Sequence, residues 1–416
     1  MRCSQLFTKT SRETPRDEES RNATLLIRGG FIAKEMAGVY VFLPLGLRVL
    51  NKVIAIIRKE INALGGQEVH LSALQNPAVW QATNRWDDKA VDVWFKTKLL
   101  NGNELGLGFT HEEPLTKLMS QYITSYKDLP KFVYQFQTKF RNEVRAKAGL
   151  LRTREFVMKD LYSFTADQDG LDQFYERAKQ AYVSIFERIG IGQETFVTFA
   201  SGGVFSKYSH EFQTVCPSGE DTIYVDYKKR IAVNKEVLTD EVLSELNLDR
   251  KQLEEVKAIE VGNIFKLGTR FSQALGLLYR DATGAQQPVV MGSYGIGPAR
   301  VMATVAELTS DQNGLCWPVA IAPARVYLVS LGGQQETKIA DTVYSKLQAA
   351  GIEVLYDDRN DVSAGQKFTD ADLIGTPFRA VVSAKTSSKV ELSRRGQKNP
   401  ELVSVSALLK KLHDVE

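Results

Sequence analysis

The sequence predicts an antiparallel sheet packed with helices, followed by a small α/β domain. Apolar and polar residues alternate over 133–145, and a second strand at 154–160 can return antiparallel to the first. Amphipathic helical patterns cover 45–64 and 169–189. After Ala322, short apolar strands alternate with helical patterns, which is typical of mostly parallel α/β sheets. We therefore expect a domain boundary near Ala322.

The composition is that of a soluble globular protein with two or three domains. The chain has 416 residues, of which 43% are apolar and 25% charged. Its net charge of +3 gives no global basic field, so any nucleic acid would have to bind to local basic patches. No apolar run approaches the ~18 residues of a membrane span, and the first twenty residues lack the apolar core of a secretory signal. We expect a cytosolic protein without membrane association.

The three cysteines, Cys3, Cys216 and Cys316, are far apart and include no C-x-x-C pair. This spacing favours neither a disulfide framework nor a structural zinc site. A reducing compartment fits the pattern.

The N-terminal half begins with a predicted helix at 45–64. Its apolar stripe consists of Leu47, Leu50, Val53, Ile54, Ile57 and Ile61. Pro44 precedes the helix and Gly65-Gly66 ends it. A strand is expected at 68–74, and a further helix from about Glu113 to Tyr126.

The strand predicted at 133–145 has one apolar and one strongly polar face. The apolar face consists of Tyr134, Phe136, Phe140 and Val144, and the polar face of Gln135, Gln137, Lys139, Arg141, Glu143 and Arg145. Charges of both signs at alternate positions indicate a site for a zwitterion or a nucleotide. A solvated edge strand with surface ion pairs explains the same pattern, and both interpretations stay open on this stretch alone.

The next segments lead to the domain boundary. The polar region 228–257, with a short helical pattern after Thr239, is typical of an insertion or linker. Strands are expected at 259–271 and 287–291, and a buried helix at 295–308. Beyond the boundary we expect three strands, at 325–331, 352–358 and 378–384, and three helices, at 336–350, 367–374 and 404–413.

Two segments carry candidate chemistry near the strand pair. GFTHEEPLT, at 108–116, places a Thr, a His and two acids before a helix, where they could hold an ammonium group. A plain helix start, with Thr110 as N-cap and Glu113 as its capping-box partner, is favoured if the segment is taken alone. The arginines between Phe140 and Phe164 suit phosphate or carboxylate because a guanidinium donates in pairs, and Phe156 could stack on a base.

Two later segments give weaker signals. His210 in SHEF is one of four histidines, and a lone histidine is more often structural than catalytic. GSYGIGPAR, at 292–300, is rich in glycine but matches neither common nucleotide-binding order. Its informative feature is Arg300 on the first turn of an apolar helix, which a buried phosphate would explain.

In order along the chain, the segments resemble those of class II aminoacyl-tRNA synthetases, specifically the bacterial-type prolyl-tRNA synthetases. The resemblance covers nearly the whole sequence. It consists of SQLFTKTSRETPRDEES, GVYVFLPLGLRVLNKV, THEE with SYKDLP, TKFRNEVR with LLRTREFVMKDLYSF, SHEF, EVGNIFKLGTRFS, GSYGIGPARVM, WPVAIAPARV, LYDDR and DADLIGTPFR. The ordered set separates the proline enzymes from the related threonine, histidine and glycine enzymes.

The resemblance implies a fold and a reaction. The fold is an α+β catalytic domain with a mixed, mostly antiparallel sheet at 1–322, followed by an α/β anticodon-binding domain at 323–416. The reaction joins L-proline to ATP, with Mg²⁺, and passes the prolyl group to the terminal adenosine of proline tRNA. The resemblance also implies a homodimer. The apolar helix after Pro44 fits its interface, but a core helix would have the same sequence pattern, and both interpretations stay open.

The resemblance assigns the central role to Arg141, between the proline carboxylate and the ATP α-phosphate. Glu155 and Asp160 would orient the arginines. Glu143 would contact the adenine and Phe156 would stack on it. The full ATP-binding set implied is Arg141, Glu143, Arg152, Phe156, Glu260, Asn263 and Arg300.

Thr110 and Glu112 would receive the secondary ammonium of proline, and His210 and Phe265 would wall its ring. In the anticodon-binding domain the resemblance implies Asp358, Arg359 and Lys367 as candidates for tRNA contact. No protein zinc site is implied.

The sequence departs from the family pattern at several positions, namely Phe109, Asn263, Ser293 and Pro298-Ala299. These departures affect the expected lining of the pocket. A relative that binds tRNA without catalysing activation should have lost Arg141, Glu143 or Arg300, and this chain keeps all three. A threonine enzyme would need a zinc-ligand set that the sequence lacks.

The chain leaves no room for the editing domain that many bacterial relatives carry between the second and third class motifs. Only about forty residues separate Asp221 from Glu260, and we expect a short linker at 222–259 in that place. We therefore expect no editing of alanyl-tRNA by this chain itself.

Overall fold

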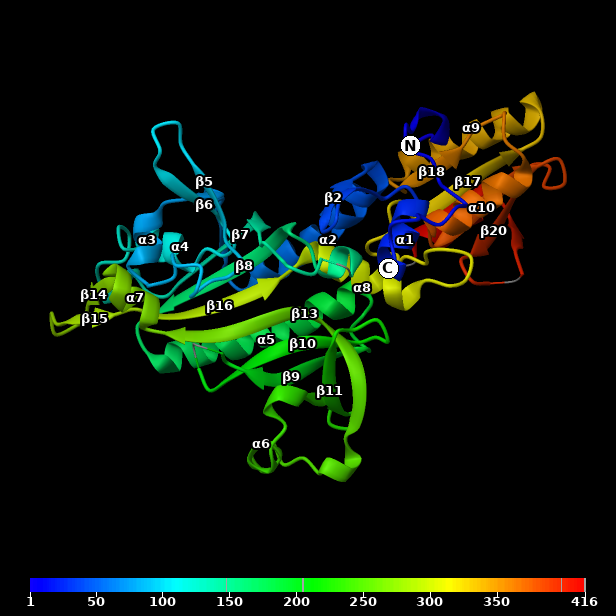
Figure 1. The fold of residues 1–416 in the computed structure, drawn as a ribbon. Coiled ribbons are helices and arrows are strands. Elements are labelled where there is room, and N and C mark those ends of the chain that lie inside the picture. The colour runs from blue at the N-terminus through cyan, green and yellow to red at the C-terminus, as the bar shows by residue number, and fades with distance from the viewer. Residues whose placement is uncertain (147, 204–205, 398, 415–416) are drawn as a thin grey trace. The chain divides into compact units, whose positions relative to one another are not determined.

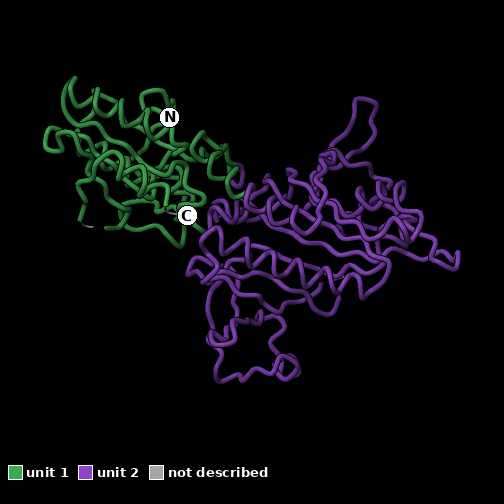
Figure 2. The backbone as a smooth tube through the Cα atoms, turned by 180° about the vertical axis from the view of Figure 1, so that it is seen from behind, with its two compact units in different colours: residues 1–36, 40–53, 305–416 green, residues 37–39, 54–304 purple. Residues whose placement is uncertain are grey.

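The computed structural model describes residues 1–146, 148–203, 206–397 and 399–414 (Figure 1). The chain forms two compact units (Figure 2). Unit 1 consists of residues 1–36, 40–53 and 305–416, and unit 2 of residues 37–39 and 54–304. The unit boundaries fall inside α2 (Pro44–Ala63) and α8 (Pro298–Thr309). The functional division expected at Ala322 stays a prediction.

Unit 2 is built on a nine-stranded sheet with the order β10-β9-β12-β11-β13-β16-β8-β7-β3. All neighbours are antiparallel except the β12–β9 and β3–β7 pairs. The strands are β3 (Gln67–Glu68), β7 (Lys131–Phe140), β8 (Glu155–Thr165), β9 (Thr195–Ser201), β10 (Tyr208–Val215), β11 (Asp221–Asp226), β12 (Ile231–Asn234), β13 (Glu254–Gly268) and β16 (Val290–Ile296).

The β7–β8 pair confirms the predicted antiparallel return. Its register places Gln135 opposite Asp160 and Lys139 opposite Phe156. The strand expected to run to 145 ends at Phe140, because its partner β8 begins at Glu155 and pairs with that residue.

The polar face of β7 is buried. Gln135 and Lys139 are each 1% exposed and Gln137 is 6% exposed. The solvated-edge interpretation of this strand is therefore wrong.

Helix α5 (Gln168–Ile189) covers one face of this sheet (Figure 1). The Asp167 side chain accepts from Gly170 N at its start, and Gly190 ends it with a φ of 98°, a value that glycine adopts without strain. Its apolar stripe packs against β8, β13 and β16. The opposite face of the same strands carries the cavities described below.

Three predicted elements differ from the structure. The helix expected to reach Tyr126 is α4 (Glu112–Met119), and a turn follows because the Asp128 carboxylate accepts from the backbone of Thr124 and Ser125. The strand expected at 259–271 ends at Gly268, whose φ of 62° turns the chain into α7 (Arg270–Leu275). The strand expected at 68–74 is reduced to β3 and the two-residue β4 (Leu74–Gln75).

Smaller elements complete unit 2. β4 belongs to a three-stranded sheet with the order β4-β6-β5, and β14 pairs with β15. Thr239 caps the short helix expected after it, because its hydroxyl accepts from Val242 N. These elements are α3 (Pro77–Gln81), β5 (Phe95–Lys98), β6 (Glu104–Leu107), α6 (Asp240–Glu245), β14 (Leu278–Arg280) and β15 (Gln286–Pro288).

Unit 1 contains a five-stranded sheet with the order β18-β17-β19-β20-β21. β17 is parallel to β18 and β19, and the last two strands are antiparallel, as a mostly parallel α/β arrangement predicts. Its elements are α1 (Arg21–Arg28), β1 (Ile32–Met36), β2 (Val39–Phe42), β17 (Val326–Leu331), α9 (Gln334–Ala349), β18 (Val354–Asp357), α10 (Ala364–Ile374), β19 (Phe378–Ser383), β20 (Val390–Arg394), β21 (Glu401–Val403) and α11 (Val405–His413). In the described part of the chain, every helix is too short or too polar to cross a membrane.

Lys159 is an unusual residue of the α5-facing side of the sheet. It is fully buried, and its Nζ donates to Tyr182 Oη (2.5 Å) and to the Tyr294 carbonyl (2.9 Å). Among the described residues no carboxylate forms an ion pair with it. Burial holds its pKa well below the ordinary value.

Replacing Lys159 by methionine is expected to raise the free energy of unfolding by about 1–3 kcal/mol. Because the pKa is lowered in the folded state, the unfolded chain binds more protons, and the wild-type protein loses stability as the pH falls below the ordinary lysine pKa. The gain should therefore be larger near pH 6 than near pH 9. Thermal unfolding at both pH values measures it, with the exposed Lys228→Met as control, and an equal effect of both substitutions would contradict the prediction.

Candidate active site

Arg141 directly follows β7 and begins the loop that leads to β8. Its backbone N–H donates to the Arg154 carbonyl (2.8 Å), which closes the loop. Its Nε donates to the Phe109 carbonyl (3.4 Å), and its Cζ lies 5.2 Å from the centroid of the Phe156 ring. One carbonyl and one ring thus hold the guanidinium.

Two cavities of unit 2 meet at Arg141. One has a volume of about 100 Å³ and lies toward Arg152 and Arg300. The other has a volume of about 330 Å³ and lies toward Thr110 and Glu112. Both are lined by Arg141, Glu143, Met158, Asn263 and Gly295.

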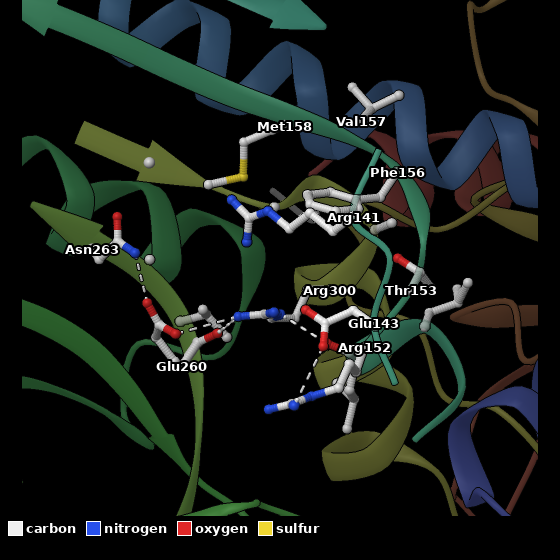
Figure 3. Close-up of a pocket in the computed structure, with 17 residues that line it drawn as sticks. Arg141, Glu143, Arg152, Thr153, Phe156, Val157, Met158, Glu260, Asn263 and Arg300 are labelled. Atoms are coloured by element: carbon white, nitrogen blue, oxygen red, sulfur yellow. Dashed lines mark hydrogen bonds and ion pairs between the residues drawn. The ribbon is translucent and has the colours of Figure 1, made fainter. Parts of the chain in front are cut away.

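The smaller cavity combines arginines with carboxylates (Figure 3). Arg300, on the first turn of α8, donates from Nε to the Leu151 carbonyl (3.0 Å), and its Nη1 lies 3.4 Å from Glu260 Oε2. Asn263 Nδ2 donates to the other oxygen of Glu260 (2.7 Å). Arg152 Nη1 lies 3.6 Å from Glu143 Oε2. The structure therefore brings the predicted ATP set together around one cavity.

Arg141 differs from the other two arginines in lacking a carboxylate partner within ion-pair distance among the described residues. Burial lowers its pKa, and the nearby positive charge of Arg300 lowers it further, while Glu260 and Glu143 act in the opposite direction. A guanidinium stays protonated in proteins. The site therefore contains one cation whose charge is incompletely balanced.

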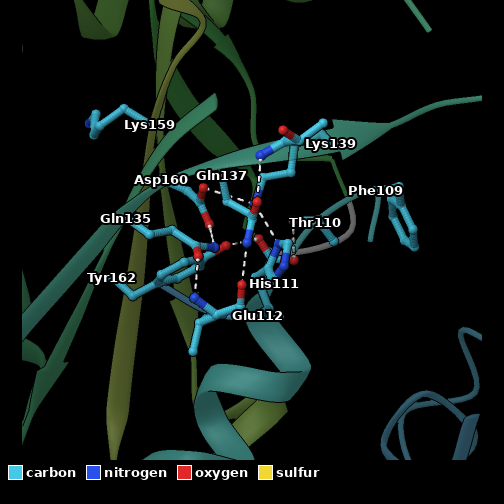
Figure 4. A network of polar contacts seen from close by, with 12 residues as sticks. Phe109, Thr110, His111, Glu112, Gln135, Gln137, Lys139, Lys159, Asp160 and Tyr162 are labelled. Carbon is cyan, nitrogen blue, oxygen red and sulfur yellow. Dashed lines mark hydrogen bonds and ion pairs between the residues drawn. The ribbon is translucent and has the colours of Figure 1, made fainter. Parts of the chain in front are cut away.

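The larger cavity has Glu112 on its wall (Figure 4). Thr110 Oγ1 donates to Glu112 Oε2 (2.6 Å), and Tyr162 Oη donates to Oε1 (3.2 Å). The N-cap of α4 is His111, without a side-chain capping bond, so the interpretation of Thr110 as a plain N-cap is wrong. Both carboxylate oxygens of Glu112 are instead oriented by hydroxyl groups.

A buried polar network lies at the floor of this cavity (Figure 4). Lys139 Nζ lies 2.9 Å from Asp160 Oδ1 and contacts His111 Nδ1, and Gln135 Nε2 donates to Asp160 Oδ2 (3.0 Å). Burial and the charge of Lys139 lower the pKa of His111 to about 4. Asp160, expected to orient an arginine, pairs with this lysine instead.

Sequence reasoning missed Arg85, which lies in the segment between α3 and β5. Its Nη1 is 2.8 Å from Glu113 Oε1 and 3.6 Å from Glu112 Oε2. Burial raises the pKa of Glu113 to about 7, although Arg85 counteracts the shift. A lone arginine in NRWDD gave no periodic signal that could have placed it here.

The structure brings Phe265 to the larger cavity but not His210. His210 pairs with Ile264 across β10 and β13, and its Nδ1 lies 2.9 Å from Tyr175 Oη of α5. Its ring therefore faces α5, and burial lowers its pKa to about 4. The neighbouring Glu211 pairs with Asn263 on the cavity side, where burial and the charge of Glu260 raise its pKa to about 7.

The three candidates in unit 1 divide into two groups. Arg359 and Lys367 line a cavity of about 600 Å³ beside the ends of β17 and β18. The Asp358 carboxylate accepts hydrogen bonds from Ser4 and Arg2. Within the described residues, no group of three or more His, Cys, Asp or Glu side chains is arranged to hold a metal ion.

Comparison with known proteins identifies the family to which the chain belongs. Residues 95–309 match the model of the tRNA synthetase class II core domain (G, H, P, S and T), and residues 325–414 match that of an anticodon binding domain. A proline–tRNA ligase of Methylobacterium radiotolerans is 36% identical, with 100% of both chains covered. The chain belongs to the proline–tRNA ligases. This membership confirms the predicted class II catalytic domain and the α/β domain that follows it.

A proline–tRNA ligase of Moorella thermoacetica is 33% identical, with 96% of both chains covered. That alignment spans 550 positions, 134 more than the 416 residues of this chain. The alignment with the Methylobacterium ligase spans 446 positions. Proline–tRNA ligases thus differ in length by segments that this chain does not share.

Solved structures show the same fold. A prolyl-tRNA synthetase of Cryptosporidium parvum complexed with L-proline and AMP gives a TM-score of 0.76 at 16% identity, covering 95% of this chain and 75% of that one. The enzyme of Giardia lamblia in complex with prolyl-adenylate gives 0.77 at 19% identity, covering 94% and 77%. At such identities the likeness concerns the fold.

The Lys139–Asp160 pair allows a direct test of the buried network. Asp160→Asn should lower the free energy of unfolding by about 3–5 kcal/mol, because it leaves a buried lysine without its carboxylate. Combining it with Lys139→Met should recover most of the loss. Urea unfolding of the two variants measures this, and equal instability of both would contradict it. Asp172→Asn, which breaks the exposed pair with Lys266 (2.8 Å), is the control and should cost less than about 1 kcal/mol.

Proposed function

We propose that this chain activates L-proline with ATP to prolyl-adenylate and transfers the prolyl group to the terminal adenosine of proline tRNA. The observation that supports the chemistry best is the position of Arg141. It lies where the two cavities meet and has no carboxylate partner among the described residues. Two anionic groups, one in each cavity, would supply the missing negative charge.

In the activation step a carboxylate oxygen of proline attacks the α-phosphorus of ATP. The new bond joins this oxygen to phosphorus, the bond from phosphorus to the bridging oxygen breaks, and pyrophosphate leaves. No protein nucleophile is needed, so catalysis consists of alignment and charge stabilisation. Arg141 would donate to both reacting groups, and its preorganised charge favours the transition state in which they approach.

The smaller cavity would take the nucleotide. Phe156 would stack on the adenine, Glu143 would contact its polar edge, and Arg152 and Arg300 would hold the outer phosphates. Glu260 holds Arg300 at the cavity, while Arg152 is shared between Glu143 (3.6 Å) and Glu220 (2.8 Å). Asn263 would fix Glu260, to which it already donates.

The same carboxylates fit Mg²⁺. Glu143 lines the cavity from the loop after β7, and Glu260 lines it from β13. Carboxylate oxygens are the protein ligands that Mg²⁺ prefers. Bound there with ATP, the ion would neutralise part of the phosphate charge.

The larger cavity would take proline. The secondary ammonium would donate to Glu112, whose two oxygens are already oriented by Thr110 and Tyr162. A charge-assisted contact of this kind is stronger than one between neutral groups. Phe265 would contact the ring. His210 faces α5 and has no direct part in this proposal.

The remaining parts of the proposal concern tRNA and assembly. We assign residues 1–322 to catalysis and 323–416 to anticodon binding, with Arg359 and Lys367 as the tRNA contacts. Phosphate contacts should make tRNA binding sensitive to salt. We also propose a homodimer, because unit 1 exposes Met36 (58%), Val41 (50%) and Leu47 (46%) near the start of α2. Sedimentation at low protein concentration measures the oligomeric state.

Arg141→Ala should lower the rate of proline-dependent exchange of pyrophosphate into ATP by about 10²–10³-fold, because one preorganised donor to the developing charge is lost. The exposed Arg145, in the same loop, gives the control Arg145→Ala, which should leave exchange unchanged. Exchange by Arg141→Ala at the wild-type rate would refute the proposed mechanism. Running the wild-type assay with all twenty amino acids tests the choice of proline.

We further propose that this chain does not edit alanyl-tRNA. Residues 222–259 form most of β11, then β12, α6 and the start of β13, and leave no space for a separate domain. A pocket discriminates by only about 1–3 kcal/mol per methylene, so alanine should support slow exchange. Alanyl-tRNA specific for proline should survive incubation with the protein at its spontaneous rate. Rapid enzyme-dependent hydrolysis is the outcome that would overturn this expectation.

A further inference from the structure

The first ten residues run along the α/β sheet of unit 1, and they precede the region matched by either family model. Arg2 forms a parallel bridge with Tyr356, and Tyr356 N donates to the Met1 carbonyl (2.9 Å). Tyr356 belongs to β18, the edge strand of that sheet. The segment therefore covers an edge whose backbone groups would otherwise be unpaired.

The segment reaches the end of β18 through Asp358. Arg2 Nη1 lies 3.1 Å from Asp358 Oδ2, and Ser4 donates from its backbone N (3.0 Å) and its Oγ (2.9 Å). Burial alone would raise the pKa of Asp358, but the bonds from Ser4 and Arg2 outweigh it and lower the pKa. Asp358 therefore anchors the segment.

Arg359 is held by two buried carboxylates. Its Nε and Nη2 donate to Asp357 (2.8 and 2.6 Å), and Nη2 also donates to Asp370 Oδ2 (2.7 Å). The segment contacts Asp370 directly and Asp357 through Tyr327. Thr10 Oγ1 donates to Asp370 Oδ1 (2.6 Å), and Cys3 Sγ lies 3.7 Å from Tyr327 Oη, which donates to Asp357 Oδ2 (2.9 Å).

Arg359 also lines the cavity of about 600 Å³. The cavity lies at the carboxyl ends of β17 and β18, where ligands of open α/β sheets usually bind. Lys367 lines it as well, and its Nζ donates to the carbonyls of Ser330 (2.8 Å) and Asp357 (3.3 Å). Lys367, like Arg359, is therefore held at the carboxyl end of β18.

We propose that residues 2–10 are a positioning segment for tRNA binding, which acts by fixing the carboxylates that orient Arg359. The inference rests on the proposed function of residues 323–416, which belong to unit 1, in anticodon binding. A long arginine side chain loses conformational freedom when it binds a ligand. Holding it in place beforehand reduces that loss, so the segment increases the affinity for tRNA without contacting it.

Thr10→Val removes the hydroxyl bond to Asp370 with little change in shape. The Michaelis constant for proline tRNA should rise about three- to tenfold, as the loss of one charge-assisted hydrogen bond predicts. The aminoacylation kcat and the proline-dependent pyrophosphate exchange, which needs no tRNA, should stay at wild-type values. Thr342→Val is the matched control, because the Thr342 hydroxyl donates only within α9, to the Lys338 carbonyl (2.9 Å).

A double-mutant cycle separates positioning from general damage. In an Arg359→Lys background, Thr10→Val should have almost no further effect, because its action passes through the replaced side chain. Independent multiplication of the two effects overturns the proposal, as does an unchanged Michaelis constant for tRNA or an equal loss of exchange activity. If thermal unfolding shows that Thr10→Val is damaged, Thr10→Ala, which removes the same hydroxyl bond to Asp370, serves in its place with the same expectations. Failure of the wild-type protein to exchange pyrophosphate with proline would instead count against the proposed function.

Discussion

The site depends on the Arg141 guanidinium, which has no carboxylate within ion-pair distance among the described residues. The antiparallel pairing of β7 with β8 ends at Phe140 and Glu155, and Arg141 is the first residue beyond it. Its position is therefore fixed by a regular ladder, while its side chain extends to the junction of two cavities. Strand pairing gives the precise placement, and the positive charge at this point suits the two anionic groups of the proposed reaction.

The neighbouring charges show how the fold keeps this cation available. Glu143 and Glu260 lie close enough to influence Arg141, yet their ion pairs are with Arg152 and Arg300. In the larger cavity and next to it, Asp160 forms an ion pair with Lys139, and Glu113 forms one with Arg85. Each carboxylate that could neutralise Arg141 thus has another cation nearer to it. Among the described residues, Arg141 therefore lacks an ion-pair partner at the junction of the two cavities.

Much of the fold was predictable because its signals are local. The β7–β8 pair, α5 and the strand–helix alternation of unit 1 each follow from the period of apolar residues over one segment. The burial of Lys139 did not follow, because it contacts His111, far away in sequence, and the other nitrogen of His111 lies against the Ser72 carbonyl. The side on which His210 lies depends on strand register and on a bulge between Phe212 and Gln213, which no periodicity shows. The candidate site could be predicted through family resemblance, but Arg85 and Tyr162 could not be found from composition or spacing.

The burial of Lys139 at the larger cavity also has a thermal consequence. The free energy of hydrating a charged group becomes less favourable as temperature rises, so the cost of keeping Lys139 and Asp160 away from water falls on heating. Apolar packing around them gains no comparable advantage. The contribution of this ion pair to the stability of the larger cavity should therefore become more favourable as the protein is warmed.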